Sequence, residues 1–247
     1  FEPRFLYHCD RLGYMVWGEY GSWSMNITEL DAVAIFLPEW LESVRRDYNH
    51  PALITWCPFN ESWDTSHHFP ELQGKEQNND VVRIVYEQTK QLDPTRIVED
   101  NSVCRYDHVE TDINTWHFYL NSYEVVRDHI RKVVENTYPG SEFNYIGGNK
   151  QTDVPLMNSE CGMVWGVDES AGDSDLAWQY HYMLNEYRLH EKICGFVFTE
   201  FHDVVNEFNG YYRIDDTDKD FGYQDFCRGM KIRALHSPDF LALDCAP

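Results

Sequence analysis

The sequence predicts an α/β fold, a (β/α)8 TIM barrel in which strands 3 to 8 are visible. Short apolar runs alternate with amphipathic helical stretches along the 247 residues, which indicates parallel strands covered on both faces. Between Glu61 and Glu160, three strand–helix steps of roughly 33 residues each match the repeat of a barrel with eight units. No GxGxxG motif and no P-loop favours a nucleotide-binding fold.

Six apolar runs of strand type alternate with five stretches of helical periodicity. The predicted strands are residues 14–19, 52–59, 96–100, 112–119, 154–160 and 194–201. The predicted helices are residues 3–12, 29–48, 81–92, 122–137 and 175–191. Gly13 should close the first helix and Asp80 should cap the third. Pro38 should kink or restart the second helix, because proline lacks a backbone N–H donor.

Six strands leave two strands of the barrel unaccounted for. We expect them to precede residue 1, because the chain opens on a helix already under way and the segment after Phe201 is polar and irregular. An open barrel exposes two sheet edges, which invites pairing. The sequence therefore predicts further N-terminal sequence, a partner that supplies strands, or an unusual local closure.

The composition restricts the partners and the compartment. With 42 acidic and 20 basic residues, the formal net charge is −22, which argues against nucleic acid and membrane surfaces because both would repel the chain. The seven cysteines are odd in number, form no CxxC pair and fall mostly in apolar runs. Reduced, buried thiols favour a cytoplasmic over a secreted protein. Assembly into a homo-oligomer stays open.

Polar residues follow the predicted strands at the point where each strand ends. They are Glu19, Asn60, Glu61, His117, Tyr119, Glu160 and Glu200. The carboxyl ends of barrel strands share one mouth, so we expect these side chains to line a common pocket. Carboxylates, an amide and aromatic rings suit a neutral sugar, and an acidic mouth disfavours a glucuronide.

Glu61 and Glu160 are the candidates for catalysis. Cleavage of a glycoside needs one protonated carboxyl group to assist the leaving oxygen and one ionised carboxylate at the anomeric carbon. In a retaining enzyme the two groups lie roughly 5 to 5.5 Å apart, and strands 4 and 7 would place them across the barrel from each other. Taken alone, either glutamate is explained equally well by a structural role, as a helix cap or as the partner of an arginine.

Four motifs carry a resemblance to a known family. The stretch "RRDYNHPALITWCPFNES" (45–62) resembles the acid/base signature of glycoside hydrolase family 2, and "VPLMNSECG" (154–162) is similar to its nucleophile strand. "EPRFLYHCDRLGYMVWGE" (2–19) resembles the segment that leads into barrel strand 3, and "GFVFTEFHDVVNEFNGYY" (195–212) resembles a strand-8 ending of one branch. The resemblance covers nearly the whole chain. We therefore expect residues 1–247 to form one catalytic barrel domain of a longer protein.

The resemblance implies a β-galactosidase-like enzyme that hydrolyses terminal β-linked sugars with retention and needs no organic cofactor. Glu61 would be the acid/base and Glu160 the nucleophile. Asn60 would bind the sugar 2-hydroxyl, and the hydroxyl of Tyr119 would orient the nucleophile. Independently of the resemblance, the strand-end positions of Glu19 and Glu200 suggest that both contact substrate.

Three further residues keep two interpretations each. His117 would bind a hydroxyl or serve structure, Trp165 would be a sugar platform or a lid, and Trp63 would wall the site or simply pack.

The chain departs from the family pattern in two places. Thr199-Glu200 stands where the nearest branch has Thr-Gln, which puts the floor of the sugar site in doubt. Cys161 replaces a common aromatic residue and would enlarge the pocket. His67, His68 and His202 with Glu19 lack the spacing of a metal site, so we predict no metal and interpret these histidines as solvated loop residues.

Two other functions stay open. A degenerate barrel would bind carbohydrate without cleaving it. An endo-acting β-glucanase or mannanase of another retaining barrel family would share the Asn-Glu and Glu strand ends.

Overall fold

The computed structural model describes residues 1–22, 25–62, 75–104, 106–120, 122–162, 173–205 and 207–218, with side chains omitted for 173–179. The chain forms two compact units. The first contains Phe1–Trp116 and Thr137–Met157, and the second contains His117–Asn136 and Asn158–Pro247. Trp63, His67, His68 and Trp165 lie outside the described residues.

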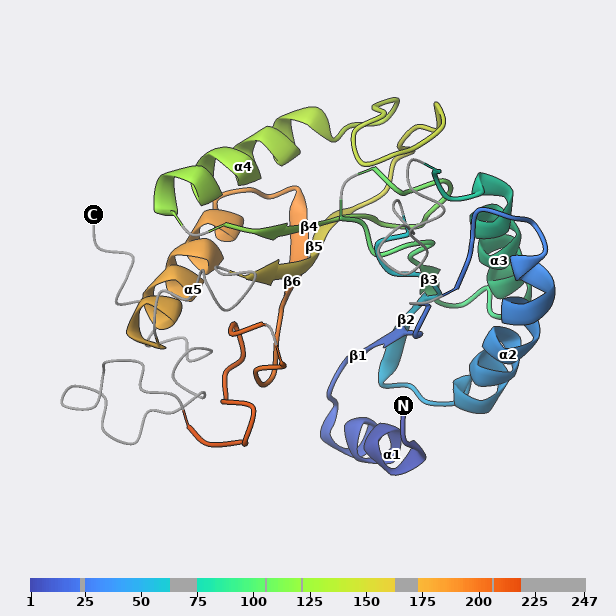
Figure 1. Ribbon diagram of the computed structural model, residues 1–247, viewed down its shortest axis with the longest axis horizontal. Coiled ribbons are helices and arrows are strands. Elements are labelled where there is room, and N and C mark those ends of the chain that lie inside the picture. Colours follow the sequence, from blue (N-terminus) through green and yellow to red (C-terminus); the bar gives the residue numbers. More distant parts are fainter. Residues whose placement is uncertain are drawn as a thin grey trace. The chain divides into compact units, whose positions relative to one another are not determined.

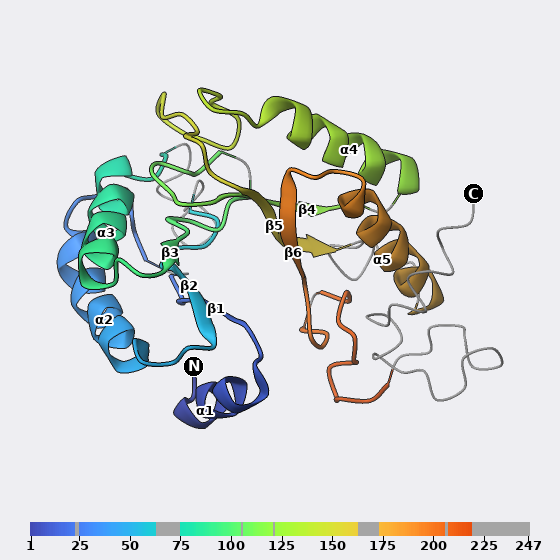
Figure 2. The ribbon, with the colours of Figure 1, turned by 180° about the vertical axis from the view of Figure 1, so that it is seen from behind.

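Among its described residues, the first unit contains a parallel sheet and three helices. Its elements are α1 (Pro3–Leu12), β1 (Val16–Glu19), α2 (Ala32–Asp47), β2 (Leu53–Cys57), α3 (Asn79–Leu92) and β3 (Ile97–Val98). The strand order is β1-β2-β3, and Trp56 pairs with Gly18 on one side and with Val98 on the other. Figures 1 and 2 show α2 and α3 side by side. This parallel strand–helix alternation confirms the predicted class of structure for this unit.

Burial of aromatic rings fixes the end of β2. Phe59 is fully buried and stacks on Phe36 of α2 with ring centroids 4.7 Å apart. Trp40 lies edge-on to Trp56 at 6.0 Å, and its indole N–H donates to Thr89 Oγ1 of α3 at 2.7 Å. Stacked and edge-on pairs of this kind stabilise a core beyond their buried area. The backbone that leads to Asn60 is therefore held by the helices on its flank.

The helices lie where the sequence predicts, with ends that differ by at most three residues. Gly13 closes α1 in the left-handed conformation, with φ 68°, as predicted. The cap of α3 is Asn78, whose side chain accepts from the Asp80 N–H, so the prediction of Asp80 as the cap is wrong. Pro38 lies inside α2 without ending it, because burial of Phe36, Trp40 and Val44 on either side keeps the helix packed.

The second sheet contains β4 (Asn114–Tyr119), β5 (Leu156–Gly162) and β6 (Ile193–Phe198) in the order β4-β5-β6. Asn114 N–H donates to the Pro155 carbonyl and Leu120 N–H to the Gly162 carbonyl, so β4 and β5 run parallel. The helices that follow are α4 (Tyr123–Asn136) and α5 (Asp173–Arg188).

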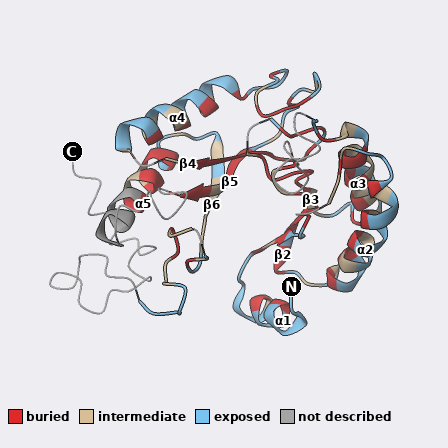
Figure 3. Cartoon of the chain, viewed as in Figure 1, coloured by how far each residue is buried: buried red, intermediate tan, exposed pale blue. Residues whose placement is uncertain are grey.

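Helix α4 turns Val126, Ile130 and Val133 inward, and α5 buries Met183 and Leu184 (Figure 3). These residues recur at the spacing of one helical face, as the sequence predicts. Within the described part of the chain, no helix has both the length and the apolar character that crossing a membrane requires.

Candidate active site

The backbone that carries Asn60 and Glu61 extends the sheet past the end of β2. Asn60 forms a parallel bridge with Ser102. Ser102 N–H donates to the Phe59 carbonyl at 2.8 Å, and Glu61 N–H donates to the Ser102 carbonyl at 2.9 Å. Asn60 Oδ1 is buried with no hydrogen-bond partner among the described residues. A buried acceptor without a partner is unfavourable, so this oxygen is suited to a hydroxyl donor.

Glu61 adopts a left-handed backbone conformation with φ 48°. A side chain with a Cβ rarely occupies this region, and such residues concentrate at functional sites. The strand-like pairing of Ser102 with Phe59 and with Glu61 itself holds the backbone on the N-terminal side of Glu61.

Tyr119 and His117 both contact the carboxylate of Glu160. The Tyr119 hydroxyl donates to Glu160 Oε1, and His117 Nδ1 lies 3.3 Å from Oε2. His117 and Tyr119 project from the same face of β4, two residues apart, and Glu160 lies on the adjacent strand β5. Both carboxylate oxygens are therefore held in place at the carboxyl end of this sheet.

The environment keeps Tyr119 a hydrogen-bond donor. Burial, together with the negative charge of Glu160, raises the pKa of the Tyr119 hydroxyl well above its ordinary value. The ring packs against β5 because position 162 is glycine: a Cβ there would lie 2.8 Å from Tyr119 Cδ1 and 2.7 Å from the Asn209 amide nitrogen. A larger residue at this point would displace the tyrosine.

Glu200 follows β6 in an acidic setting. Burial raises the pKa of its carboxyl group to about 7, with further contributions from the negative charges of Glu207 and Asp203. Its Oε1 is buried with no hydrogen-bond partner among the described residues. Glu160 contributes to the same shift. The second unit thus brings His117, Tyr119, Glu160 and Glu200 into one electrostatic neighbourhood.

The remaining predicted residues have simpler settings. Glu19 is exposed at the end of β1, in register with Cys57 of β2. Cys161 is fully buried beside Glu160, and burial raises the pKa of its thiol to about 12, so it remains a protonated thiol. His202 Nδ1 lies 2.9 Å from the Asp203 carbonyl oxygen. That Glu61 and Glu160 meet across one pocket stays a prediction.

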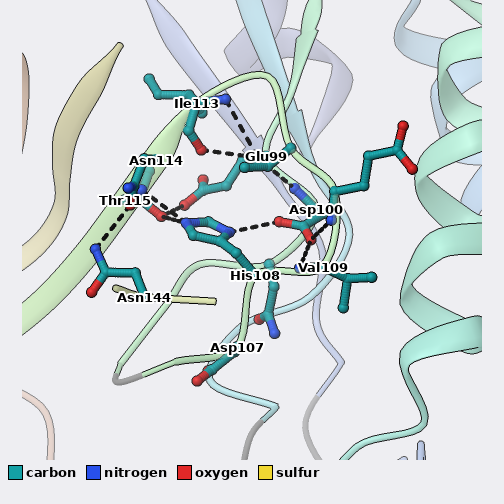
Figure 4. Close-up of polar contacts among 12 residues, drawn as sticks. Glu99, Asp100, Asp107, His108, Val109, Ile113, Asn114, Thr115 and Asn144 are labelled. Atoms are coloured by element: carbon teal, nitrogen blue, oxygen red, sulfur yellow. Dashed lines mark hydrogen bonds and ion pairs between the residues drawn. The ribbon is translucent and has the colours of Figure 1, made fainter. Parts of the chain in front are cut away.

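Sequence reasoning missed a buried polar network directly after β3 (Figure 4). Glu99, Asp100, Asn101 and Ser102 are consecutive, and each is at most 2% exposed. The signal that selected the other strand ends applies equally here, since these four polar residues lie at the end of the predicted strand 96–100 and directly after it. It was overlooked because the stretch that continues to Thr111 has the composition of a solvated loop.

His108 is the centre of that network. Its Nδ1 lies 2.7 Å from Asp100 Oδ1, and its Nε2 accepts the Thr115 backbone N–H at 2.9 Å. This pattern assigns the proton to Nδ1, which donates to Asp100. Thr115 Oγ1 and the Trp17 indole N–H donate to the two oxygens of Glu99, each at 2.6 Å.

The comparisons with known proteins now identify the class. Residues 2–226 match the family model described as "Glycosyl hydrolases family 2, TIM barrel domain". The chain belongs to this family, which confirms the predicted TIM-barrel fold and shows a glycoside hydrolase domain.

Relatives agree with this assignment. The chain is 27% identical to a β-glucuronidase of Rattus norvegicus over 83% of its own length and 32% of the relative. A GH2 β-galacturonidase from Eisenbergiella tayi matches with TM-score 0.67 and 19% identity, over 88% of this chain and 40% of that one. A β-glucuronidase of Bacteroides uniformis matches with TM-score 0.65 and 18% identity, over 88% and 28%. The chain thus spans less than half the length of these relatives.

Proposed function

We propose that this chain carries the catalytic residues of a retaining β-glycosidase acting on terminal β-linked sugars, with Glu160 as nucleophile and Glu61 as acid/base. The observation that carries the proposal is the pair of contacts to Glu160. Tyr119 donates to one carboxylate oxygen and His117 lies 3.3 Å from the other. A carboxylate oriented at both oxygens, at the end of a strand of this family's barrel domain, suits attack on an anomeric carbon.

In the first step, an oxygen of Glu160 forms a bond to the anomeric carbon as the glycosidic bond breaks. Glu61 gives its proton to the departing oxygen, and a covalent glycosyl-enzyme results. In the second step, Glu61 takes a proton from water, whose oxygen attacks the same carbon and releases Glu160. Asn60 Oδ1, the buried acceptor beside Glu61, would receive the hydrogen of the sugar 2-hydroxyl.

The electrostatics of the second unit favour a neutral hexoside such as a β-galactoside. Glu200 shares its surroundings with Glu207, Asp203 and Glu160, and these negative charges are part of what raises its pKa to about 7. A sugar carboxylate placed among them would be repelled. This argument supports the galactosidase-like function that the sequence predicts.

A β-uronide is the second candidate, and the relatives favour it. The similar proteins reported above are named β-glucuronidases and a β-galacturonidase. A protonated Glu200 would reduce the repulsion by donating a hydrogen bond to the sugar carboxylate in place of a charge. Cleavage of uronides in preference to galactosides would select this candidate.

The test uses the full-length protein and a panel of nitrophenyl β-glycosides: galactoside, glucoside, mannoside, glucuronide and galacturonide. We expect hydrolysis of at least one substrate, with the β-anomer of the sugar appearing first by NMR. Glu160→Gln should abolish turnover. Glu61→Gly should keep activity only toward substrates with very good leaving groups or with azide added.

Four outcomes would overturn the proposal. Ordinary rates in both variants would remove the assigned roles, and the α-anomer as first product would exclude retention. Sugar binding without hydrolysis would indicate a non-catalytic carbohydrate-binding module. Cleavage of polysaccharides in preference to every aryl monosaccharide would indicate an endo-acting glycanase.

A further inference from the structure

We propose that Asn101 and Gln77 are positioning residues that fix the direction of Glu61 through their hydrogen bonds to the side chain of Ser62. The proposal rests on the role of Glu61 as acid/base given above. It concerns contacts within the first unit.

Glu61 needs support on both sides, because its left-handed backbone is an unfavourable conformation for a residue with a Cβ. On the preceding side, the backbone hydrogen bonds between Ser102 and positions 59 and 61 provide it. These bonds fix where the Glu61 nitrogen lies. They leave the direction of the following peptide to be set by Ser62.

Ser62 is 7% exposed, which is unusual for a polar residue just past the end of a strand. Its hydroxyl donates to Gln77 Oε1 and accepts a hydrogen bond from Asn101 Nδ2. The same Asn101 nitrogen lies 3.2 Å from Gln77 Oε1. Ser62, Gln77 and Asn101 thus form a closed triangle of polar atoms immediately after Glu61.

Both amide side chains that hydrogen-bond to Ser62 are themselves held in place by their surroundings. Gln77 Nε2 donates to the Asp107 carbonyl at 2.8 Å. Asn101 is fully buried and directly follows Asp100, whose two carboxylate oxygens bind His108 and the backbone N–H groups of Val109 and Glu110 (Figure 4). A rotation of the Glu61–Ser62 peptide would therefore break hydrogen bonds inside a buried network, where water cannot replace the lost hydrogen-bond partners.

A general acid must lie within hydrogen-bond reach of the leaving oxygen, and small misplacements lower its contribution steeply. Its contribution also depends on the leaving group. A phenyl glycoside needs protonation of the departing oxygen, whereas a 2,4-dinitrophenyl glycoside departs without it. The ratio of kcat/KM between these two substrates therefore measures how well Glu61 is placed.

The experiment measures that ratio in the full-length protein, with the sugar that the nitrophenyl panel selects. Asn101→Ala and Gln77→Ala should each lower kcat/KM for the phenyl glycoside at least about tenfold and change the dinitrophenyl value less than about twofold. The double variant should be no worse than the poorer single variant, because both act through Ser62. Ser62→Ala, which removes only the hydroxyl, should show the same change in ratio.

Gln151→Ala is the matched control. Gln151 is a buried amide of the same unit, 5% exposed, and its Oε1 accepts from Asn114 Nδ2 at 2.8 Å. Among the described residues, the hydrogen-bond partners of its side chain are Asn114 and Val154, so it does not contact Ser62, Gln77 or Asn101. Its loss should leave the ratio of the two substrates unchanged, even where stability falls. Circular dichroism of each variant verifies that it is folded.

The outcomes separate this proposal from the proposed function. An equal fall for both substrates in Asn101→Ala, Gln77→Ala and Ser62→Ala, or an unchanged ratio, overturns the positioning role. Glu61→Gly in the same panel tests the acid/base assignment itself. If Glu61→Gly shows no dependence on the leaving group, the proposed function fails. If Glu61→Gly shows it and the other three variants do not, only this inference fails.

Discussion

The hydroxyl of Tyr119 donates a hydrogen bond to Oε1 of Glu160, and a glycine two residues beyond that glutamate leaves the space for the tyrosine ring. Three positions on two strands therefore form this contact: Tyr119 on β4, and Glu160 and Gly162 on β5. A hydrogen bond to an ionised group contributes roughly 1.5–3 kcal/mol, and it fixes the direction of the oxygen as well.

We expect Tyr119→Phe to lower kcat toward aryl β-glycosides about 10- to 100-fold, because the nucleophile loses the donor that orients it. Steady-state kinetics of the full-length protein measures the change. Tyr86→Phe is the matched control, since Tyr86 donates to the Asp112 carboxylate at 2.9 Å in the first unit. It should reduce stability and leave kcat within about twofold. Equal kcat losses in both variants would contradict the role of Tyr119.

Glu200 should make stability fall as pH rises toward neutrality. Its carboxyl pKa is about 7 in the folded chain against an ordinary 4.5, so the folded chain binds more protons between these values. The free energy of unfolding then decreases as pH rises through this interval. Glu200→Gln cannot ionise and should lack that decrease.

Urea unfolding at pH 5 and pH 8 measures this difference. Glu142→Gln, which replaces an exposed acid paired with Lys150, should keep the pH dependence of the natural chain. The prediction is wrong if Glu200→Gln and the natural chain lose the same free energy between the two pH values.

Two histidine–aspartate pairs of similar length should differ strongly in energy. His108 and Asp100 are 2.7 Å apart and both fully buried, whereas His50 and Asp10 are 2.6 Å apart and about one-quarter exposed. Removing His108 leaves a buried carboxylate with fewer donors, so His108→Ala should destabilise the chain by about 3 kcal/mol. His50→Ala should cost much less, because solvent screens that pair. Urea unfolding of both variants compares them, and equal losses would refute the importance of burial.

Gly18 should tolerate no side chain. A Cβ at this position of β1 would lie 2.8 Å from the Thr55 carbonyl oxygen and 3.2 Å from the Trp56 ring. Gly18→Ala should therefore destabilise the chain by about 1–3 kcal/mol. Gly21→Ala is the control, since a Cβ there meets nothing within 4 Å. Thermal unfolding distinguishes the two, and a Gly18→Ala variant as stable as Gly21→Ala would contradict the packing of β1 on β2.

Much of the fold follows from local sequence patterns. Short, mainly apolar runs predict β2 and β5, and helical periodicity predicts α4, because these patterns depend only on residues near one another. The error at the cap of α3 is also local: Asn78 and Asp80 have equivalent capping chemistry two residues apart, and the backbone decided between them.

The candidate site was predictable only in part. Strand ends identify Glu160 and Tyr119, since the register of parallel strands places them at one edge. The triangle of Ser62, Gln77 and Asn101 joins residues up to 39 positions apart, and no periodicity encodes such a contact. In the sequence these amides and hydroxyls are indistinguishable from solvated loop residues; only tertiary contacts satisfy them in the interior.

The left-handed backbone at Glu61 serves catalysis at the expense of the stability of the folded chain. Glycine would occupy φ 48° without strain, so Glu61→Gly should lose activity toward substrates with ordinary leaving groups and yet be more resistant to unfolding by up to about 1 kcal/mol. Engineering that selects variants of this protein for heat resistance alone would therefore favour the replacement of Glu61. Such a selection needs an activity assay with substrate from the first round.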